Sequence, residues 1–435
     1  MGIISKYFAN KNEMSEREYT YARFGFIADV AFINGAGCFL AGAYLTGLLS
    51  MLGATEAQSN FILSLVLPSS FVQLLVPIIN RCLTHKKAFV YFTRILEIFL
   101  PAVAFLLPMF FDNWQSLVWV VGILFFIKYS IGWIGSPANQ DMLMNCLSEG
   151  GGIGKFSGIR SSVSNVVCCV AAFVAGQIAK AHTGDREVYG YMYLAIIALA
   201  FLVCEAVVFF FVKEPYTEGN KKAPETEGFV KTFKKMFSNS NVMGYIRQGV
   251  LHTSANNLAN PIINILCIQR LGLSLEVLSY LSVISLLVRI VLAPIAGKLS
   301  DKIGCRKVMT FGLMVAAVAY VIHANMTVAN VLILKVISVA ISCFGDAALG
   351  APSFAYMFES LPLENRASYM SCISVFTHSI SYVVSLVATF IIGVCSGMTF
   401  NVFGIDYSVL SLLLYAAAVL IMLSALTLIG KPKKE

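Results

Sequence analysis

Long stretches of apolar residues with few or no charges recur along this 435-residue sequence. Each is close to the roughly 20 residues that an α-helix needs to cross the hydrocarbon core of a bilayer. Strands of a transmembrane barrel would instead alternate apolar and polar residues over about ten positions. Only 12% of the residues are charged, whereas about 25% are charged in an ordinary soluble domain. The sequence therefore predicts an all-α integral membrane protein.

The apolar stretches predict twelve transmembrane helices. We expect them near residues 24–51, 57–80, 88–111, 117–146, 156–180, 190–212, 242–268, 275–297, 308–326, 328–357, 367–395 and 407–429. Basic residues gather in alternate loops, for example Lys86 and Lys87 in one and Lys298 and Lys302 in another. The positive-inside rule then predicts a multi-pass protein of the cytoplasmic (inner) membrane with both termini in the cytoplasm. The net charge of +8 is explained by these loops, so we expect no nucleic-acid partner.

A charged stretch at residues 213–241 separates two sets of six predicted helices. We expect an N-terminal bundle at 1–212, a cytoplasmic linker at 213–241 and a C-terminal bundle at 242–435. Similar segments that begin at Pro77 and Pro294 close the second helix of each set. Duplicated halves are characteristic of transporters, so the sequence predicts two pseudo-symmetric bundles.

The segment from Gly297 to Lys307 reads GKLSDKIGCRK and lies between the eighth and ninth predicted helices. It resembles the loop pattern G-x-x-x-D-R/K-x-G-x-R-R/K of the major facilitator superfamily. Residues 359–366 resemble the E-x-x-P-x-x-x-R element of that superfamily, and 154–160 resemble its G-K/R-x-x-G-x-R pattern. The resemblance implies the major facilitator fold and a cytoplasmic gate built from Asp141, Arg160, Gly297, Asp301, Arg306, Glu359 and Arg366. Ordinary positive-inside charge is the alternative explanation of these residues.

Polar residues inside the predicted helices are candidates for solute binding, because polar groups at bilayer depth are costly. The resemblance implies that the first, fourth, seventh and tenth helices line a central cavity. The candidates on the first, fourth and seventh are Asn34, Lys128, Trp133, His252, Asn256, Asn257, Asn260 and Asn264. An amide both donates and accepts hydrogen bonds, which suits polar neutral solutes. The alternative is that the asparagines tie neighbouring helices together.

Three titratable residues are candidates for proton coupling: Asp29, Asp346 and His378. An ion pair between Lys128 and Asp29 would make these two residues a structural pair or an anion-selecting site. We favour Asp346, because no cation is so obviously placed near it apart from Lys335 on its own helix. For His378 a packing role is equally expected. Three other charged groups have structural explanations. The i, i+3 spacing of Arg94 and Glu97 allows the two charges to neutralise each other. Arg289 can extend its side chain toward the cytoplasmic face. Glu205 can reach the membrane interface or a partner.

The leading functional hypothesis is a secondary active transporter that moves a small polar organic solute by alternating access, coupled to a proton. The alternatives are a drug-type proton antiporter and a transporter-like sensor without flux. Residues 150–156 lack the glycine and the Ser or Thr that a P-loop needs, which disfavours an ATP-driven pump. No metal-ligand or nucleophile motif stands out. We therefore expect no enzymatic activity, no cofactor, and a monomer that contacts its solute, protons and lipid.

Overall fold

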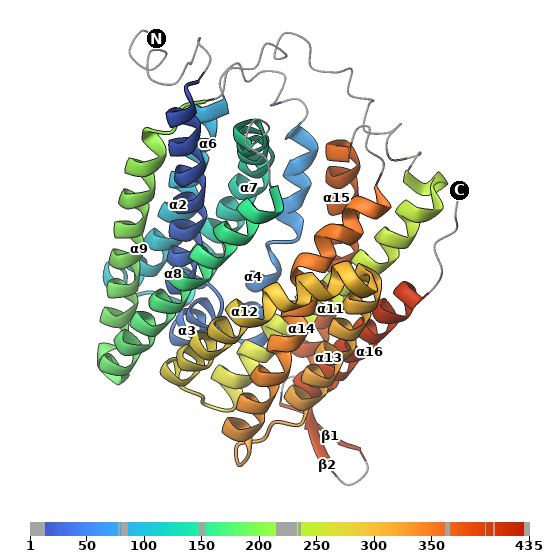
Figure 1. Cartoon of the computed structure of the whole chain (residues 1–435). Helices are drawn as coiled ribbons and strands as arrows, with labels where there is room; N and C mark the ends of the chain where they lie inside the picture. Colours follow the sequence, from blue (N-terminus) through green and yellow to red (C-terminus); the bar gives the residue numbers. More distant parts are fainter. Residues whose placement is uncertain are drawn as a thin grey trace. The chain divides into compact units, whose positions relative to one another are not determined.

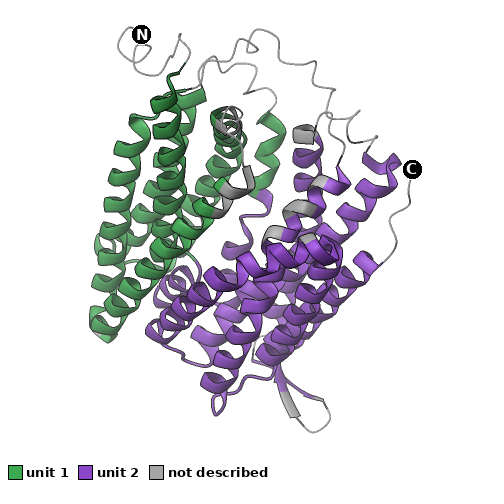
Figure 2. Ribbon diagram, in the orientation of Figure 1, with its two compact units in different colours: residues 1–41, 69–226 green, residues 42–68, 227–435 purple. Residues whose placement is uncertain are grey.

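The structure, a computed structural model, describes residues 14–76, 79, 86–147, 153–214, 233, 236–361, 366–395, 397–402 and 405–429. Long α-helices make up most of them (Figure 1). The described helices fall into two compact units (Figure 2). Unit 1 comprises residues 1–41 and 69–226, and unit 2 comprises residues 42–68 and 227–435. Most of the linker predicted at 213–241 lies outside the described residues.

Unit 1 is built on five long helices. They are α2 (Glu16–Leu40), α6 (Lys86–Leu106), α7 (Trp114–Leu147), α8 (Ile153–Ala181) and α9 (Glu187–Phe210), with the 3-10 helices η1 (Pro68–Leu75), η2 (Leu107–Met109) and η3 (Gly184–Arg186) between them. Helix α2 packs against α8 and α9, and α6 packs against α7 and α9. A capping box at Ser15 and Glu18 starts α2, because the two residues satisfy each other's backbone N–H groups.

Unit 2 contains six long helices and two short ones. They are α3 (Ala43–Met51), α4 (Glu56–Ser64), α11 (Ser240–Ile265), α12 (Leu275–Ile303), α13 (Cys305–Ala324), α14 (Val331–Ser360), α15 (Arg366–Val394) and α16 (Val409–Ile429). A π-helix, η5 (Leu266–Arg270), continues α11. Strands β1 (Thr399–Val402) and β2 (Ile405–Ser408) form an antiparallel hairpin that the hydropathy pattern did not predict, with Thr399 opposite Ser408.

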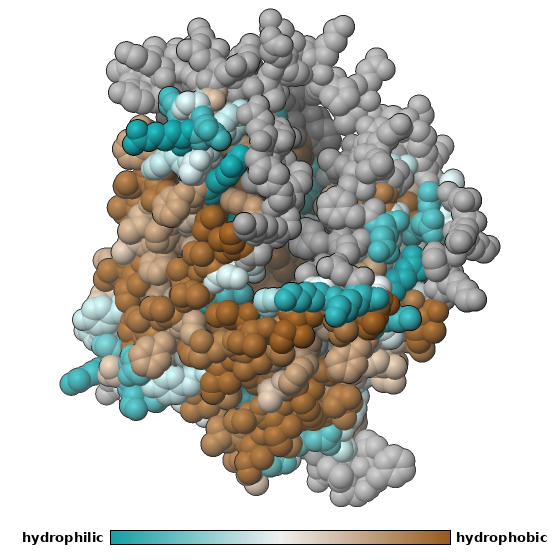
Figure 3. Space-filling view, viewed as in Figure 1, coloured by the Kyte–Doolittle hydropathy of each residue, from teal (hydrophilic) through white to brown (hydrophobic). Residues whose placement is uncertain are grey.

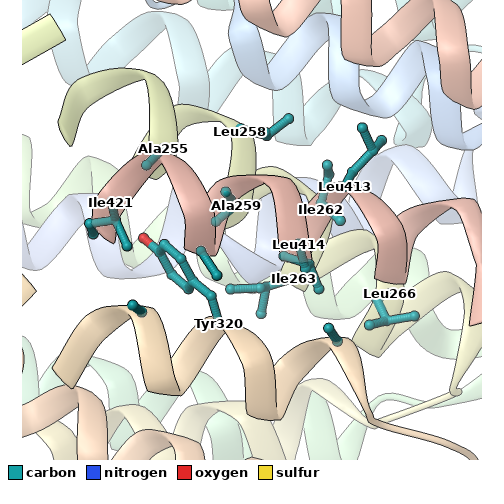
Figure 4. Close-up of a cluster of buried hydrophobic side chains, with 14 of the residues drawn as sticks. Ala255, Leu258, Ala259, Ile262, Ile263, Leu266, Tyr320, Leu413, Leu414 and Ile421 are labelled. Atoms are coloured by element: carbon teal, nitrogen blue, oxygen red, sulfur yellow. The ribbon is translucent and has the colours of Figure 1, made fainter. Parts of the chain in front are cut away.

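The core of unit 2 lies where α11, α13 and α16 meet. Figure 4 shows Ala259 and Ile262 of α11 near Leu414 and Ile421 of α16, with the ring of Tyr320 from α13 beside them. All of these side chains are buried. Many large apolar side chains on the outer helix faces are exposed instead, and apolar colour covers much of the visible face in Figure 3. An apolar exterior is expected where lipid is the solvent.

Eleven helical segments in the described part of the chain are long and apolar enough to cross a membrane. They correspond to eleven of the twelve predicted spans. The other span is α11, which has 26 residues. Its length suffices, but its asparagine, glutamine, arginine and histidine residues lower its mean hydropathy.

Two predicted spans are interrupted, which the sequence analysis did not anticipate. The first breaks between α2 and α3 at Gly42, whose φ of 58° and ψ of −123° suit only glycine. The second changes from α4 to η1 near Pro68, which has no N–H to continue the helical ladder. Residues 42–68, between the two breaks, therefore pack with unit 2, although their neighbours in sequence belong to unit 1.

Candidate transport site

A cluster of charged side chains occupies the interior of unit 1, around Asp29 of α2. Asp29 is only 1% exposed. Its Oδ1 lies 3.4 Å from Nε of Arg94 on α6, and its Oδ2 lies 3.9 Å from Nη2 of Arg160 on α8. Asn139 of α7 donates from Nδ2 to the same Oδ2 at 3.4 Å. A carboxylate this deep in a membrane protein is tolerable because two cations and an amide surround it.

The cations beside Asp29 are thus two arginines. Lys128, which the sequence left as a possible partner of Asp29, has its ammonium 4.3 Å from the ring centroid of Tyr129. Among the described residues Lys128 forms no ion pair. Arg94 and Arg160 instead lie beside the two oxygens of the Asp29 carboxylate.

Arg94 joins two carboxylates. Its Nη1 donates to Oε2 of Glu97 at 2.8 Å, which confirms the pairing predicted from the i, i+3 spacing. Its Nε faces Asp29 at the same time. The guanidinium is therefore part of the cluster and not only a local partner of Glu97.

Glu205 of α9 is a member of this cluster that the sequence analysis missed. It is 1% exposed, so it does not reach an interface as expected. Neither of its carboxylate oxygens has a hydrogen-bond partner among the described residues. Asp29, Arg94 and Glu97 act on it electrostatically. Its position in a strongly apolar helix was the available signal, because a lone charge at such depth needs a reason.

The other predicted residues of unit 1 lie apart from the cluster centre. Asn34 donates to Oγ of Ser164 at 2.9 Å and so joins α2 to α8. Trp133 is half-buried on α7. Arg160 also donates from Nε to the carbonyl of Phe26 at 3.2 Å. The side chain of Asp141, its predicted partner, lies outside the described ones.

In unit 2 the polar face of α11 is partly used for structure. Asn256 donates from Nδ2 to Nε2 of His252 at 2.9 Å, and its Oδ1 accepts from the hydroxyl of Tyr320 at 2.6 Å. Asn257 donates to the carbonyl of Thr253 at 2.8 Å. Asn256 therefore ties α11 to α13, as the alternative reading proposed.

Further along α11, two asparagines keep their amides available. Asn260 is exposed and Asn264 is half-buried. Neither forms a hydrogen bond within the described part of the chain. Their role in solute binding therefore stays a prediction.

Asp346 of α14 has a cation beside it, contrary to expectation. Nη1 of Arg289, from α12, lies 3.7 Å from Oδ2 of Asp346. The side chains are 40% and 48% exposed, respectively. Arg289 therefore has a carboxylate partner on a neighbouring helix. The argument that favoured Asp346 as the protonation site loses its basis.

Two histidines occupy polar networks in unit 2. His378 of α15 is half-buried, 3.4 Å from Oγ of Ser374. The other network was not predicted. His323 donates from Nδ1 to the carbonyl of Ala319 at 2.7 Å, which leaves Nε2 to accept from the buried ammonium of Lys335 at 3.2 Å.

The predicted cytoplasmic gate is partly described. Gly304 forms the whole connection between α12 and α13, with a φ of 94°. Arg306 lies over the ring of Tyr356, 5.1 Å from its centroid, and the thiol of Cys305 donates to Glu359 at 3.3 Å. The start of α13 thus contacts the predicted region at the end of α14. Gly297 is half-buried within α12, and the side chains of Asp301 and Arg366 lie outside the described ones.

Polar contacts hold α4 within unit 2. Arg270 of η5 pairs with Glu56. Gln269 donates to Ser59 at 2.9 Å, and Asn60 donates to Thr389 of α15 at 2.8 Å. These contacts fasten residues 42–68 to unit 2.

Long apolar helices with charged groups buried in their interior define the chain as a multi-pass membrane protein. The family model of the Major Facilitator Superfamily matches residues 248–435 of this chain. This match and the solved structures described below confirm the predicted fold class. No curated protein sequence matches the chain.

Solved structures of transporters share the fold at low sequence identity. A mutant of the nucleoside transporter NupG is 11% identical, with a TM-score of 0.68 over 94% of this chain and 100% of that chain. A bacterial homolog of the human lysosomal transporter Spinster, inward-facing and unoccupied, is 13% identical, with a TM-score of 0.67 over 95% and 97%. A POT family transporter in complex with 5-aminolevulinic acid is 11% identical, with a TM-score of 0.65 over 94% and 95%.

Proposed function

We propose that the chain is a proton-coupled transporter that moves a small polar organic solute across the cytoplasmic membrane by alternating access. The observation that carries the proposal is the charge cluster of unit 1. Asp29 and Glu205 place two buried carboxylates within electrostatic range of one guanidinium, that of Arg94. Burying such a cluster in a membrane costs free energy, so buried charges of this kind usually mark functional sites.

The cluster gives a proton a defined effect. Arg94 divides its guanidinium between Asp29 and Glu97. When Asp29 takes up a proton, its attraction for Arg94 falls and the guanidinium turns fully to Glu97. Proton binding at Asp29 then changes the electrostatic field at α6. If this field affects the affinity for the solute, the solute in turn changes the affinity of Asp29 for the proton.

The orientation and the type of solute belong to the same proposal. Both termini and the linker at 213–241 are placed in the cytoplasm, following the distribution of basic loop residues. The amides of Asn260 and Asn264 on α11 supply hydrogen-bond donors and acceptors for the solute. Proteins of the same fold carry nucleosides or bind 5-aminolevulinic acid, and these are small polar solutes.

Solute-dependent proton movement tests the proposal. The full chain is reconstituted in liposomes that contain the pH dye pyranine, and uridine, maltose, succinate, L-leucine and dialanine are added outside in turn. We expect at least one solute to acidify the lumen, and no change in protein-free liposomes. The Asp29→Asn variant should bind that solute without acidification. Labelled uptake of a solute without any proton movement would contradict proton coupling.

A further inference from the structure

A small cavity opens among α2, α6 and α7 of unit 1. Its volume is about 40 Å³. A water molecule needs roughly 10–15 Å³ on this scale, so the cavity has room for two or three waters or for the polar head of a small molecule. Most of its lining is apolar, and Ile33, Ile98 and Phe125 are examples. Two charged side chains, Glu97 and Lys128, complete the wall.

These two side chains have opposite charges but are not paired with each other. Among the described residues Glu97 accepts a hydrogen bond only at Oε2, from Arg94, so Oε1 remains able to accept. Lys128 lies over the ring of Tyr129 and has no hydrogen-bond or ion-pair partner in the described part of the chain. Opposite charges in a medium of low dielectric attract strongly, so a cavity that separates them suits a polar guest between them.

A glycine on α7 makes space for the carboxylate. Gly132 follows Lys128 by one helical turn, and a Cβ at this position would lie only 3.1 Å from Oε1 of Glu97. The missing side chain therefore lets Oε1 rest against the backbone of α7. This close approach keeps the carboxylate on the same stretch of helix as the ammonium.

We propose that this cavity binds the head group of an amphoteric solute, with its ammonium on Glu97 and its carboxylate on Lys128. The inference rests on the proposed transport function, for which it names the solute class. The apolar lining accepts the carbon atoms next to the head group. A solute with only one charge leaves one wall group unmatched, and a neutral solute leaves both unmatched, which costs affinity.

Arg94 connects this cavity to the proton. It touches Glu97 and Asp29, so a change in the charge of Asp29 changes the hold of Arg94 on Glu97 and with it the attraction of Glu97 for the ammonium. Binding of the amphoteric solute and binding of the proton should therefore be linked.

Ligand-dependent thermal stability of the purified full chain tests the inference, because a ligand that binds only the folded state raises the apparent melting temperature. The probes are glycine, L-leucine and L-phenylalanine, together with isoamylamine and 4-methylpentanoate, which are leucine without its carboxylate and without its amine. We expect an amphoteric probe to stabilise the chain at concentrations at least tenfold lower than either one-charge analogue.

Variants assign the two charges. Glu97→Gln should weaken binding of the amphoteric probe at least tenfold and leave binding of 4-methylpentanoate unchanged. Lys128→Met should weaken binding of the amphoteric probe and leave binding of isoamylamine unchanged. Gly132→Ala keeps every charge and should weaken the probe severalfold by displacing the carboxylate. Lys213→Met, beyond the end of α9, is the control and should change nothing.

Three outcomes would overturn the inference. They are no stabilisation by any amphoteric probe, equal stabilisation by the one-charge analogues, and full binding by Glu97→Gln and Lys128→Met. Stabilisation by uridine or maltose alone would also overturn it, but would leave the proposed transport function standing. Amphoteric binding without proton movement in pyranine-loaded liposomes would instead contradict the proton coupling.

Discussion

Nη1 of Arg289 lies 3.7 Å from Oδ2 of Asp346 and so joins α12 to α14. Because both side chains are substantially exposed, the pair is expected to contribute only about 0–1 kcal/mol to stability. Asp346→Asn should therefore change the melting temperature little and leave accumulation driven by a pH gradient intact. Arg289→Gln should behave in the same way. Accumulation that fails in Asp346→Asn while solute exchange persists would transfer the coupling proton to Asp346.

The buried carboxylates of unit 1 should respond differently to neutral substitution. Glu205 has no hydrogen-bond partner in the described part of the chain, so a neutral amide at this position breaks no contact seen there, and Glu205→Gln should preserve the melting temperature. Asp29→Asn removes the anion that faces Arg94 and Arg160, and breaking such a buried pair costs about 3–5 kcal/mol. Thermal unfolding of both variants checks this contrast. Equal destabilisation would show that Glu205 is ionised and paired.

The sequence predicted the features that depend on local spacing. Apolar length gave the helices, and the i, i+3 spacing gave the pair of Arg94 and Glu97. It did not predict which face of a helix meets which neighbour. Asp346 and Arg289 come from different helices, and only their packing brings them together.

Depth within a helix posed a second difficulty. The same apolar pattern surrounds Glu205 whether its carboxylate turns toward lipid headgroups or into the bundle. The break at Gly42 was also hidden, because a glycine in an apolar run is compatible with a continuous helix. Hydropathy depends only on composition. The direction of the Glu205 side chain and the break at Gly42 depend on packing and on backbone angles, which composition does not specify.

Two glycines of α2 provide a matched test of packing. A Cβ at Gly35 would lie 2.5 Å from the ring of Phe201, whereas a Cβ at Gly37 would meet nothing within 4 Å. Alanine favours a helix over glycine by about 1 kcal/mol at either position. Gly37→Ala should therefore keep or raise the melting temperature, and Gly35→Ala should lower it by overpacking at about 1–3 kcal/mol. Similar melting temperatures for the two variants would contradict the packing of α2 on α9.

The contact between α13 and α14 leads to a prediction about the gate. Arg306 lies over Tyr356, and we expect this end of α13 to separate from α14 if the predicted gate operates during transport. Asp301→Asn and Tyr356→Leu should slow transport and leave ligand-induced stabilisation largely unchanged. Lys307→Gln is the comparison for a simple loss of loop charge. Transport at the normal rate in Asp301→Asn would show that the gate is wrongly assigned.

The pairing of Glu56 with Arg270 allows a charge-swap test of the segment 42–68. Glu56→Arg and Arg270→Glu should each alter the transport rate up to about fivefold, since an exposed pair is worth at most about 1 kcal/mol. The double swap should recover most of the rate. If the double swap is as impaired as the sum of the single variants, the pair does not control this segment.

Proton coupling through the Asp29 cluster is tested most directly by comparing gradient-driven uptake with counterflow in the same proteoliposomes. The measurement uses the solute that acidifies the pyranine-loaded liposomes and the double variant Asp29→Asn, Glu205→Gln. The account predicts that the variant loses accumulation driven by a pH gradient but still exchanges labelled for unlabelled solute. Accumulation at the wild-type level in this variant would contradict the account.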